Sequence, residues 1–374
     1  MPPDFSRDVR CILGLPFDVV TEAQAEEAIR LAIDRRKRLF VSTPNLNFAV
    51  SCLSDKDFRA SVLQSDLSLA DGWPIVAIAR LIGAALPGRV AGSSLFHRLV
   101  ASQRRPPISV YFFGGPDDVA QAACQRLNSL SSGAVCTGFH SPGFGSVAEL
   151  SSTQCLERLN AARPDLVVVA LGAKKGQAWI RHNLAYIDAP VISHLGAVIN
   201  FIAGTVARAP EWLQVARLEW LWRIKEEPAL WKRYTRDGLS LLRLLLTRVI
   251  ALTFHQRLLS PGIQDLERST ANLSKTSKGT TLTLTGAWTR ENVSTLRSLL
   301  TSLAASGRAV SVDMAAVTHL DSTSIGLFTL LYGWQLKTDG GWDVVAPSRA
   351  VRTALRLSCT DYLLVQHRTS PTAK

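Results

Sequence analysis

Apolar residues recur along the first 205 residues in two alternating forms. One form is a short continuous run, such as Ile108–Phe113, Asp165–Leu171 or Val191–His194, and each run ends at or near a glycine. The other form repeats apolar side chains every three or four residues, as in Thr21–Arg36. Continuous runs predict buried strands, and the periodic stretches predict amphipathic helices. Their alternation predicts an α/β domain built on a largely parallel sheet.

The pattern changes after residue 205. Residues 206–257 have helical periodicity, are rich in Trp and Leu, and contain ten Lys or Arg against five Asp or Glu. Residues 258–279 are mostly small and polar, which is typical of a linker. A second alternation of strands and helices then begins with Thr281–Thr285. We therefore expect an α/β domain over 1–205, a basic helical appendage over 206–257, a linker over 258–279 and a small α/β domain over 280–374.

Composition places the chain among folded proteins. Apolar residues make up 47% of its 374 residues, which is enough to bury a core. No stretch reaches 18 uninterrupted apolar residues, and the first 30 residues lack a long apolar run, so we expect neither a transmembrane helix nor a signal peptide. The six cysteines are scattered, without a Cys-x-x-Cys pair, which predicts reduced thiols and a cytoplasmic location.

The formal net charge of +12 predicts an acidic partner. Nucleic acid, an anionic membrane surface and a phosphorylated substrate all fit that charge. The excess is partly local, because ten minus five leaves the appendage a surplus of five positive charges. A packed helical subdomain or a contact between copies of the chain would also explain the Trp- and Leu-rich segment.

Three polar side chains follow the strand predicted at Leu39–Ser42. Thr43, Asn45 and Asn47 lie in the sequence STPNLNF, where proline prevents a helix from continuing. Hydroxyl and amide groups are suited to binding sugar hydroxyls or the edge of a uracil. Asn is also common at helix N-caps, so starting the next helix is an equal explanation.

The stretch LADGWPIVAIARLIGAALPGRVAG places an acid before an apolar helix and an arginine after it. Asp71 would follow a strand, where a carboxylate can act as a general base. Arg89, in a Gly-Arg-Val-Ala-Gly loop, can bind a diphosphate through two parallel hydrogen bonds. A helix cap at Asp71 and a solvated loop arginine at Arg89 are the alternatives.

Two further turns have the composition of anion sites. Gly114 and Gly115 separate a strand from a helix, so their backbone N–H groups can approach a phosphate, although a tight turn needs the same glycines. In LGAKKGQAW, Lys174 and Lys175 can neutralise a phosphate and Gln177 can bind a sugar. A solvated lysine pair is the alternative there.

Six sequence blocks occur in one order over about residues 10–250: TPNLNF, LADGWPIVAIARLIG, LPGRVAGSSLF, VYFFGG, LVVVALGA and GAVINFIAGTVARAPEWLQVARLEWLWRIKEEPALWKRY. Together they resemble the WecG/TagA/CpsF family of glycosyltransferases. The resemblance implies a Rossmann-like α/β domain with a basic C-terminal appendage. It also implies transfer of a sugar from a UDP-sugar to a polyprenyl-diphosphate-linked sugar, with inversion and without a required metal.

The resemblance assigns roles to individual residues. Asp71 matches the family's aspartate, the proposed base for the acceptor hydroxyl. Thr43 and Asn45 match its Thr-x-Asn pair near the substrates, and Arg89 matches the arginine proposed to bind diphosphate. The family's Pro-Lys-Gln-Glu is Lys-Lys-Gly-Gln here, so the family glutamine falls on Gly176, beside Gln177.

We therefore expect a substrate site around the catalytic base Asp71. The basic appendage would lie on the anionic inner face of the cell membrane, near the lipid-linked acceptor. These partners account for the positive charge, so we expect no nucleic acid; a homo-oligomer is compatible with the sequence. The expected substrate-binding residues are Thr43, Asn45, Asn47, Arg89, Gly114, Gly115 and Gln177, and Arg223, Lys232 and Arg233 are expected to contact the membrane or the lipid diphosphate.

The sequence predicts no metal and no cofactor. Asp55-Lys56-Asp57 has the Asp-x-Asp form that binds metals in many glycosyltransferases, but residues two apart on a helix do not face the same side. The seven histidines show no spacing typical of metal ligands.

The sequence VTHLDSTSIGL in the C-terminal domain resembles the corresponding motif of STAS domains. Ser322 follows Asp321 as the phosphorylatable serine does in that family, while Ser324 stands where glycine is usual. Ser322 is therefore either a candidate phosphorylation site or a plain helix N-cap. The resemblance implies a small α/β domain that contacts a protein partner or regulates the enzyme.

Two other functions compete with sugar transfer. A Rossmann-type oxidoreductase or another nucleotide-binding enzyme would need G-x-G-x-x-G after the first strand and an acid about 20 residues later, and the sequence has neither. A non-catalytic scaffold that tethers the STAS-like domain to a membrane complex would not need Asp71 and Arg89. We expect a glycosyltransferase of bacterial cell-surface or exopolysaccharide biosynthesis.

Overall fold

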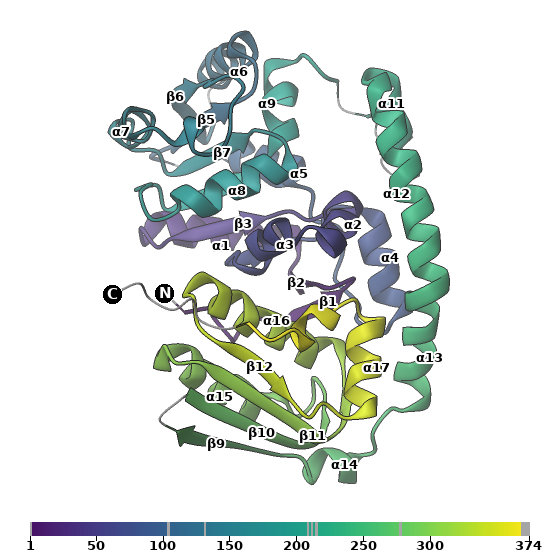
Figure 1. Ribbon diagram of the computed structural model, residues 1–374. Helices are drawn as coiled ribbons and strands as arrows, with labels where there is room; N and C mark the ends of the chain where they lie inside the picture. The colour runs from purple at the N-terminus through teal and green to yellow at the C-terminus, as the bar shows by residue number, and fades with distance from the viewer. Residues whose placement is uncertain are drawn as a thin grey trace.

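The computed structural model describes residues 2–102, 105–130, 132–207, 209–210, 212–213, 216–276 and 279–367. Its N-terminal domain is built on six parallel strands in the order β4-β3-β8-β7-β5-β6 (Figure 1). The prediction of an α/β domain with a parallel sheet is confirmed. The strands are β3 (Leu39–Ser42), β4 (Leu67–Ser68), β5 (Ile108–Gly114), β6 (Ala134–His140), β7 (Leu166–Ala170) and β8 (Val191–His194).

Alternate residues along these strands pack against two layers of helices, because successive side chains of a strand point to opposite faces. Phe112 and Val168 pack on one face with α1, α5, α6 and α9. Phe113 and Val169 pack on the other face with α7 and α8. These helices are α1 (Glu22–Asp34), α5 (Gly92–Ala101), α6 (Asp117–Ser129), α7 (Thr153–Ala161), α8 (Ala173–Asn183) and α9 (Gly196–Ala203).

A short antiparallel hairpin lies between the two domains (Figure 1). Its strands are β1 (Val9–Ile12) and β2 (Leu15–Asp18). The hairpin contributes Val9 and Cys11 to the core of the C-terminal domain, and Ile12, Leu15 and Phe17 to a core of the N-terminal domain. That second core includes α2 (Leu46–Ser54), α3 (Lys56–Leu63) and α4 (Trp73–Leu81).

The C-terminal domain has a four-stranded sheet in the order β12-β11-β10-β9. Strands β10, β11 and β12 are parallel, and β9 pairs antiparallel to β10 at the edge. The elements are α14 (Ile263–Glu267), β9 (Thr270–Thr276), β10 (Gly279–Trp288), α15 (Val293–Ser306), β11 (Val310–Leu320), α16 (Ser322–Lys337), β12 (Trp342–Val345) and α17 (Arg349–Leu357).

The expected linker over 258–279 needs correction, since it contains α14 and β9. An edge strand pairs on one side only, and no side chain between Thr270 and Lys275 is fully buried. A strand in that position tolerates the small and polar residues that made the segment look like a linker.

Two cysteines also differ from expectation. Cys124 on α6 and Cys136 on β6 form a disulfide, although both were expected as reduced thiols. They are 12 residues apart in the sequence, and only the packing of α6 beside β6 brings them together. Cys11, Cys52, Cys155 and Cys359 are free and buried.

The appendage is helical and runs along the flank of both domains (Figure 1). It contains α11 (Glu219–Glu226), α12 (Trp231–Leu244), a π-helical turn at Leu245–Val249 and α13 (Ile250–Leu258). Three of its side chains, Leu244, Val249 and Leu252, join the core formed by α2, α3 and α4. The rest of the long helix has few buried residues.

Candidate active site

The carboxyl ends of the parallel strands meet at one edge of the sheet, where ligands bind in open α/β folds. Thr43 follows β3, Asp71 follows β4, and His194 ends β8. Strand β3 pairs with both β4 and β8, so these three residues stand at the ends of neighbouring strands. The structure thus brings Thr43 and Asp71 to the same edge.

Asp71 is half-buried beside the start of α5. Its Oδ2 accepts a hydrogen bond from the backbone N–H of Gly92 at 3.4 Å, and its own N–H donates to the carbonyl of Pro44 at 3.1 Å. The alternative that Asp71 caps α4 is wrong, because Gly72 is the N-cap there and makes no side-chain hydrogen bond. The carboxylate lies instead at the N-terminal end of α5, where the helix dipole favours negative charge.

Charged neighbours surround Asp71. Burial raises the pKa of its carboxyl group, whereas the guanidinium groups of Arg89 and Arg223 lower it and Glu219 raises it. A carboxylate with a raised pKa accepts a proton more readily in a transition state, provided that it is ionised at the working pH.

Gly92 permits a close approach of three elements at this point. A side chain there would place its Cβ 2.5 Å from Cδ2 of Leu195 and 3.4 Å from Cγ2 of Thr43. Thr43 is buried, and it therefore lies against the same helix start that contacts Asp71. A hydroxyl and a carboxylate from separate strands thus meet at one helix N-terminus.

The two asparagines of STPNLNF have partners within the protein. Asn45 is the N-cap of α2, and its Oδ1 accepts from the N–H of Phe48 at 3.2 Å, so the helix-cap interpretation is confirmed for Asn45. Asn47 donates from Nδ2 to both carboxylate oxygens of Asp237 on α12, at 3.2 and 3.0 Å. Asp237 is buried, and the sequence pattern gave no indication of this partner.

Arg89 is not a solvated loop residue. Its Nη1 lies 2.6 Å from Oε1 of Glu219, the first residue of α11, and its side chain is 18% exposed. The ion pair joins the loop before α5 to the appendage. One guanidinium edge of Arg89 is therefore held by Glu219, close to Asp71.

Gly114 and Gly115 have a structural reason to be glycine. Both have positive φ, at 96° and 78°. A Cβ on Gly114 would lie 2.8 Å from the carbonyl oxygen of Ala170. The following helix α6 begins with Asp117 and Asp118, whose charges disfavour an anion at its N-terminus.

Gln177 is fully buried in a polar cluster beneath the edge of the sheet. Its Oε1 accepts from Oγ of Ser42 at 3.2 Å, and its Nε2 has no hydrogen-bond partner among the described residues. Gly176 packs on His194, since a Cβ at Gly176 would lie 2.3 Å from Cδ2 of that imidazole. Sequence reasoning missed His194, which is buried; burial lowers its pKa to about 4.

The lysines and the Asp-x-Asp sequence have structural partners. Nζ of Lys174 lies 3.0 Å from Asp55, and Nζ of Lys175 donates to the carbonyl of Gly145. Asp55 also caps α3 by accepting from Phe58. Within the described ranges, no group of three His, Cys, Asp or Glu could hold a metal ion.

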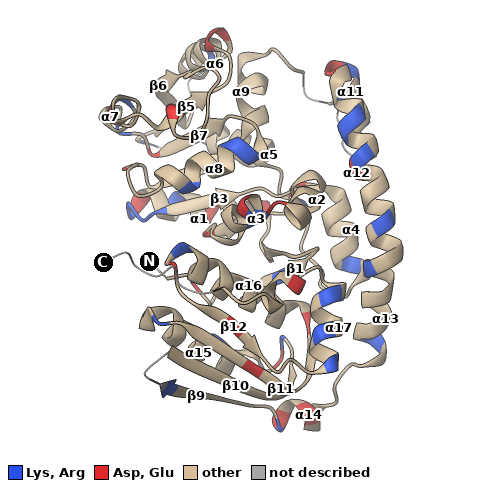
Figure 2. Ribbon diagram, viewed as in Figure 1, with Lys and Arg blue, Asp and Glu red and all other residues tan. Residues whose placement is uncertain are grey.

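Cations of the appendage lie along α11 and α12 (Figure 2). The guanidinium of Arg223 lies 5.7 Å from the ring of Phe201, and that of Arg233 lies 5.2 Å from the ring of Tyr234. Nε of Arg233 is buried and has no hydrogen-bond partner in the part of the chain that the structure describes. Lys232 is exposed.

The outer face of the long helix carries exposed apolar side chains three or four residues apart. Such spacing forms one stripe along a helix. We call this set the apolar stripe: Leu239, Leu242, Leu246, Ile250, Phe254 and Leu258, which are 46–79% exposed. The helix over Pro228–Leu258 is also long and apolar enough to cross a membrane, by length and composition, in contrast to the expectation from the sequence.

Ser322 lies at the interface between the two domains. Its Oγ donates to the carbonyl of Cys11 at 2.9 Å. It does not cap α16, because Asp321 is the N-cap and accepts from the N–H of Ser324 at 2.8 Å. The plain N-cap interpretation of Ser322 is therefore wrong, and phosphorylation of Ser322 stays a prediction.

Comparison with protein families identifies two regions. Residues 10–254 match the model of the glycosyl transferase WecG/TagA/CpsF family. Residues 271–366 match a STAS domain model described as Mlab, STAS domain. Both resemblances expected from the sequence are confirmed.

Curated relatives match the N-terminal part of the chain. A protein named N-acetylglucosaminyldiphosphoundecaprenol N-acetyl-beta-D-mannosaminyltransferase from Bacillus subtilis (strain 168) is 29% identical over 202 residues, which are 54% of this chain and 77% of the relative. A protein of the same name from Staphylococcus aureus (strain MW2) is 24% identical over 231 residues, 60% of this chain and 86% of the relative.

Proposed function

Because the chain belongs to the WecG/TagA/CpsF family of glycosyltransferases, we propose that it transfers a hexose or N-acetylhexosamine-type sugar from a UDP-sugar to a polyprenyl-diphosphate-linked acceptor. The observation that carries the proposal is the position of Asp71, at the N-terminus of α5 and within the electrostatic reach of Arg89 and Arg223. The product would enter bacterial cell-surface or exopolysaccharide biosynthesis. The names of the relatives, which describe a polyprenyl-diphosphate-linked sugar as acceptor, support this choice.

The proposed chemistry is a single displacement. The acceptor hydroxyl oxygen attacks the anomeric carbon of the donor, and the bond from that carbon to the diphosphate oxygen breaks. The electron pair of that bond leaves with UDP, and the hydroxyl proton passes to the carboxylate of Asp71. Attack on the face opposite the leaving group inverts the anomeric centre.

Positive charge stabilises the departing diphosphate in this proposal. Arg89 presents a planar guanidinium that suits phosphate oxygens, and Arg223 adds a second cation that interacts with Asp71. The N-terminus of α5 contributes its helix dipole. Thr43 lies against that helix start, and its hydroxyl would hydrogen-bond a substrate oxygen.

The apolar stripe supports attachment to the inner face of the cell membrane. A helix with an exposed apolar face and flanking Lys and Arg lies in the plane of a bilayer interface. The same helix bonds to the N-terminal domain through Asp237 and to the C-terminal domain through Gln256. A helix held by folded domains near both ends favours lying on the membrane over crossing it.

The experiment that tests the proposal measures transfer from a panel of UDP-sugars to lipid-diphosphate-linked acceptors, with and without EDTA. The Asp71→Asn variant keeps the shape and removes the base, so we expect kcat to fall about 100-fold or more. Asp57→Asn, an exposed acid on α3, is the matched control. Full activity of Asp71→Asn would exclude Asp71 as the base, and binding of UDP without transfer from any donor would favour the scaffold function.

A further inference from the structure

We propose that the STAS domain acts within its own chain as a brace, which holds the appendage helix α12–α13 beside the candidate active site. The sequence predicts a domain that contacts a separate protein or regulates the enzyme. In the structure, the surfaces at the start of α16 and along α17 are covered by the glycosyltransferase part of the same chain.

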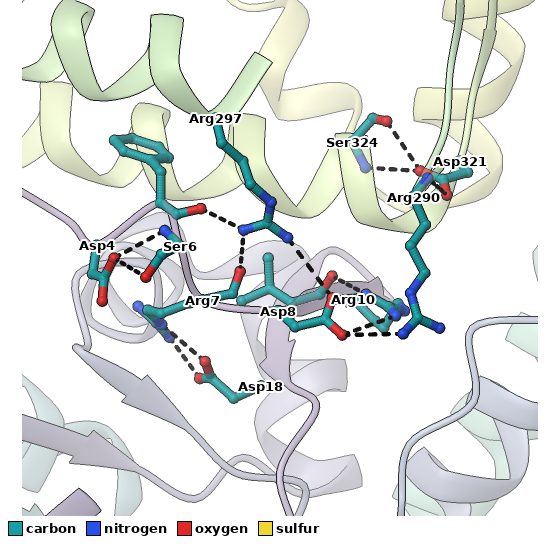
Figure 3. A network of polar contacts seen from close by, with 12 residues as sticks. Asp4, Ser6, Arg7, Asp8, Arg10, Asp18, Arg290, Arg297, Asp321 and Ser324 are labelled. Atoms are coloured by element: carbon teal, nitrogen blue, oxygen red, sulfur yellow. Dashed lines mark hydrogen bonds and ion pairs between the residues drawn. The ribbon is translucent and has the colours of Figure 1, made fainter. Parts of the chain in front are cut away.

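The N-terminal segment of the chain is built into the STAS domain (Figure 3). Phe5 is 1% exposed within the core of that domain. Arg297 on α15 donates to the backbone carbonyls of Phe5 and Arg7. The carboxylate of Asp8 lies 3.8 Å from Arg297 and 3.7 Å from Arg290. The first residues of the chain therefore fasten the two domains together.

Helix α16 is shaped to fit the glycosyltransferase domain. A Cβ on Gly326 would lie 3.1 Å from Cγ2 of Val9, and a Cβ on Gly333 would lie 2.6 Å from the carbonyl oxygen of Leu63. These glycines are seven residues apart, so they lie on the same face of the helix. Larger side chains at either position would separate α16 from β1 and α3.

The STAS domain also holds the far end of the long helix. The guanidinium of Arg248 donates to the carbonyl of Arg356 on α17, and Nε2 of Gln256 donates to the carbonyl of Leu320 at 3.1 Å. Leu252 and Cys359 are buried in one shared core. The helix thus gains contacts over its last turns that the glycosyltransferase domain alone does not supply.

The near end of the helix is fastened beside the site. Asp237 bonds to Asn47, and Glu219 on α11 bonds to Arg89. A rigid helix keeps its two ends in a fixed relative orientation, because its backbone hydrogen bonds lie within the helix. The STAS domain therefore fixes the positions of the appendage cations before the protein binds a membrane or a substrate.

The first test compares the double variant Arg248→Ala/Gln256→Ala with Arg257→Ala, in the full chain. Both remove one positive charge from the long helix, Arg248 from its π-helical turn and Arg257 from α13, but only the double variant removes hydrogen bonds to the STAS domain. Hydrogen–deuterium exchange in solution should be about tenfold faster for amides of α13 and the end of α12 in the double variant, and unchanged in the control. Sugar transfer should fall in the double variant; this second readout rests on the proposed function.

A second variant, Gly333→Leu, separates α16 from α3 without removing any charge. Circular dichroism checks that both domains stay folded, and exchange in α13 should again increase. Unchanged exchange in α13 for both variants would overturn the brace. If exchange is faster in the variants but even the wild type transfers no sugar, the brace is supported and the proposed function is refuted.

Discussion

Asp71 illustrates how a single residue depends on its neighbours. Its carboxyl group is half-buried at a helix N-terminus, and two guanidinium groups offset the cost of burying its charge. Glu219 neutralises Arg89 in part, so the local charges nearly balance before a diphosphate binds. The charge state of Asp71 should therefore respond to substitutions that never touch it.

The first prediction concerns the pH dependence of sugar transfer. A general base works when ionised, so kcat/KM should fall as the pH falls through the pKa of Asp71. Arg89→Gln removes a cation that lowers the pKa of Asp71, so it should move this acid limb to higher pH. Arg89→Lys, which keeps the charge, should leave the limb near its original position. A limb that does not move in Arg89→Gln would exclude Asp71 as its origin.

The second prediction concerns His194 and stability. Burial lowers its pKa from 6.5 to about 4, so between these values the unfolded chain binds a proton that the folded protein does not. The free energy of unfolding should therefore decrease by up to about 3 kcal/mol as the pH falls from about 6.5 to about 4. Urea unfolding at pH 7 and pH 4.5 measures this. His194→Gln should lose that part of the pH dependence, and the exposed His182→Gln should retain it.

At the scale of elements, the site depends on where helices begin. Helix α5 starts at a glycine packed against Leu195 and Thr43, and α2 starts at Asn45. Turn composition in the sequence indicates the start of α2, whereas no start for α5 is predicted from the sequence. Packing decides which acidic side chain lies beside which helix start. Asp71 packs beside the start of α5, and for that reason its interpretation as a cap of α4 was wrong.

The third prediction concerns the apolar stripe. Leu246 is 65% exposed, and a leucine buried in a bilayer interface contributes about 1.5–3 kcal/mol. Leu246→Glu should therefore weaken binding to vesicles of anionic phospholipid at least tenfold in a flotation assay. Tyr186→Glu, at a residue of the N-terminal domain that is 64% exposed and lies outside the apolar stripe, serves as the control. Equal binding of wild type and Leu246→Glu would contradict attachment through this helix.

At the scale of the whole molecule, the two domains share residues in their cores. Phe5, Val9 and Cys11 belong to the core of the STAS domain, and Cys359 belongs to a core of the glycosyltransferase domain. The exchange is mutual, so each domain is incomplete when taken by itself. Residues that the sequence assigns to one domain pack in the core of the other, so the domain boundaries along the sequence differ from those in the packing.

The fourth prediction follows from this sharing. Phe5→Ala should destabilise the STAS domain by about 3–5 kcal/mol, although residue 5 lies more than 250 residues before that domain. Hydrogen exchange of the backbone amides in β10, β11 and α15 measures this loss of stability within the STAS domain. The exposed Phe144→Ala should change nothing. Protection in the STAS domain that survives Phe5→Ala would show that the N-terminal segment is dispensable.

The sequence by itself determined the local features of this protein. Alternating apolar runs and glycine turns predict the parallel sheet, because apolar residues recur at one spacing in buried strands and at another in amphipathic helices. The motif blocks identify the family. Thr43, Asp71 and Arg89 are proposed site residues because they match the family's motifs. Asn45 can be recognised as an N-cap from the sequence, because its hydrogen-bond partner, the N–H of Phe48, belongs to the helix that follows it.

Only the tertiary structure decided which distant groups meet. Asn47 with Asp237, Arg89 with Glu219, Gly176 with His194, and Cys124 with Cys136 are pairs from separate elements. No periodicity along the chain encodes such pairs, because each depends on how helices and strands pack. The polar edge strand β9 and the position of Ser322 against β1 were hidden for the same reason: their partners come from other parts of the chain.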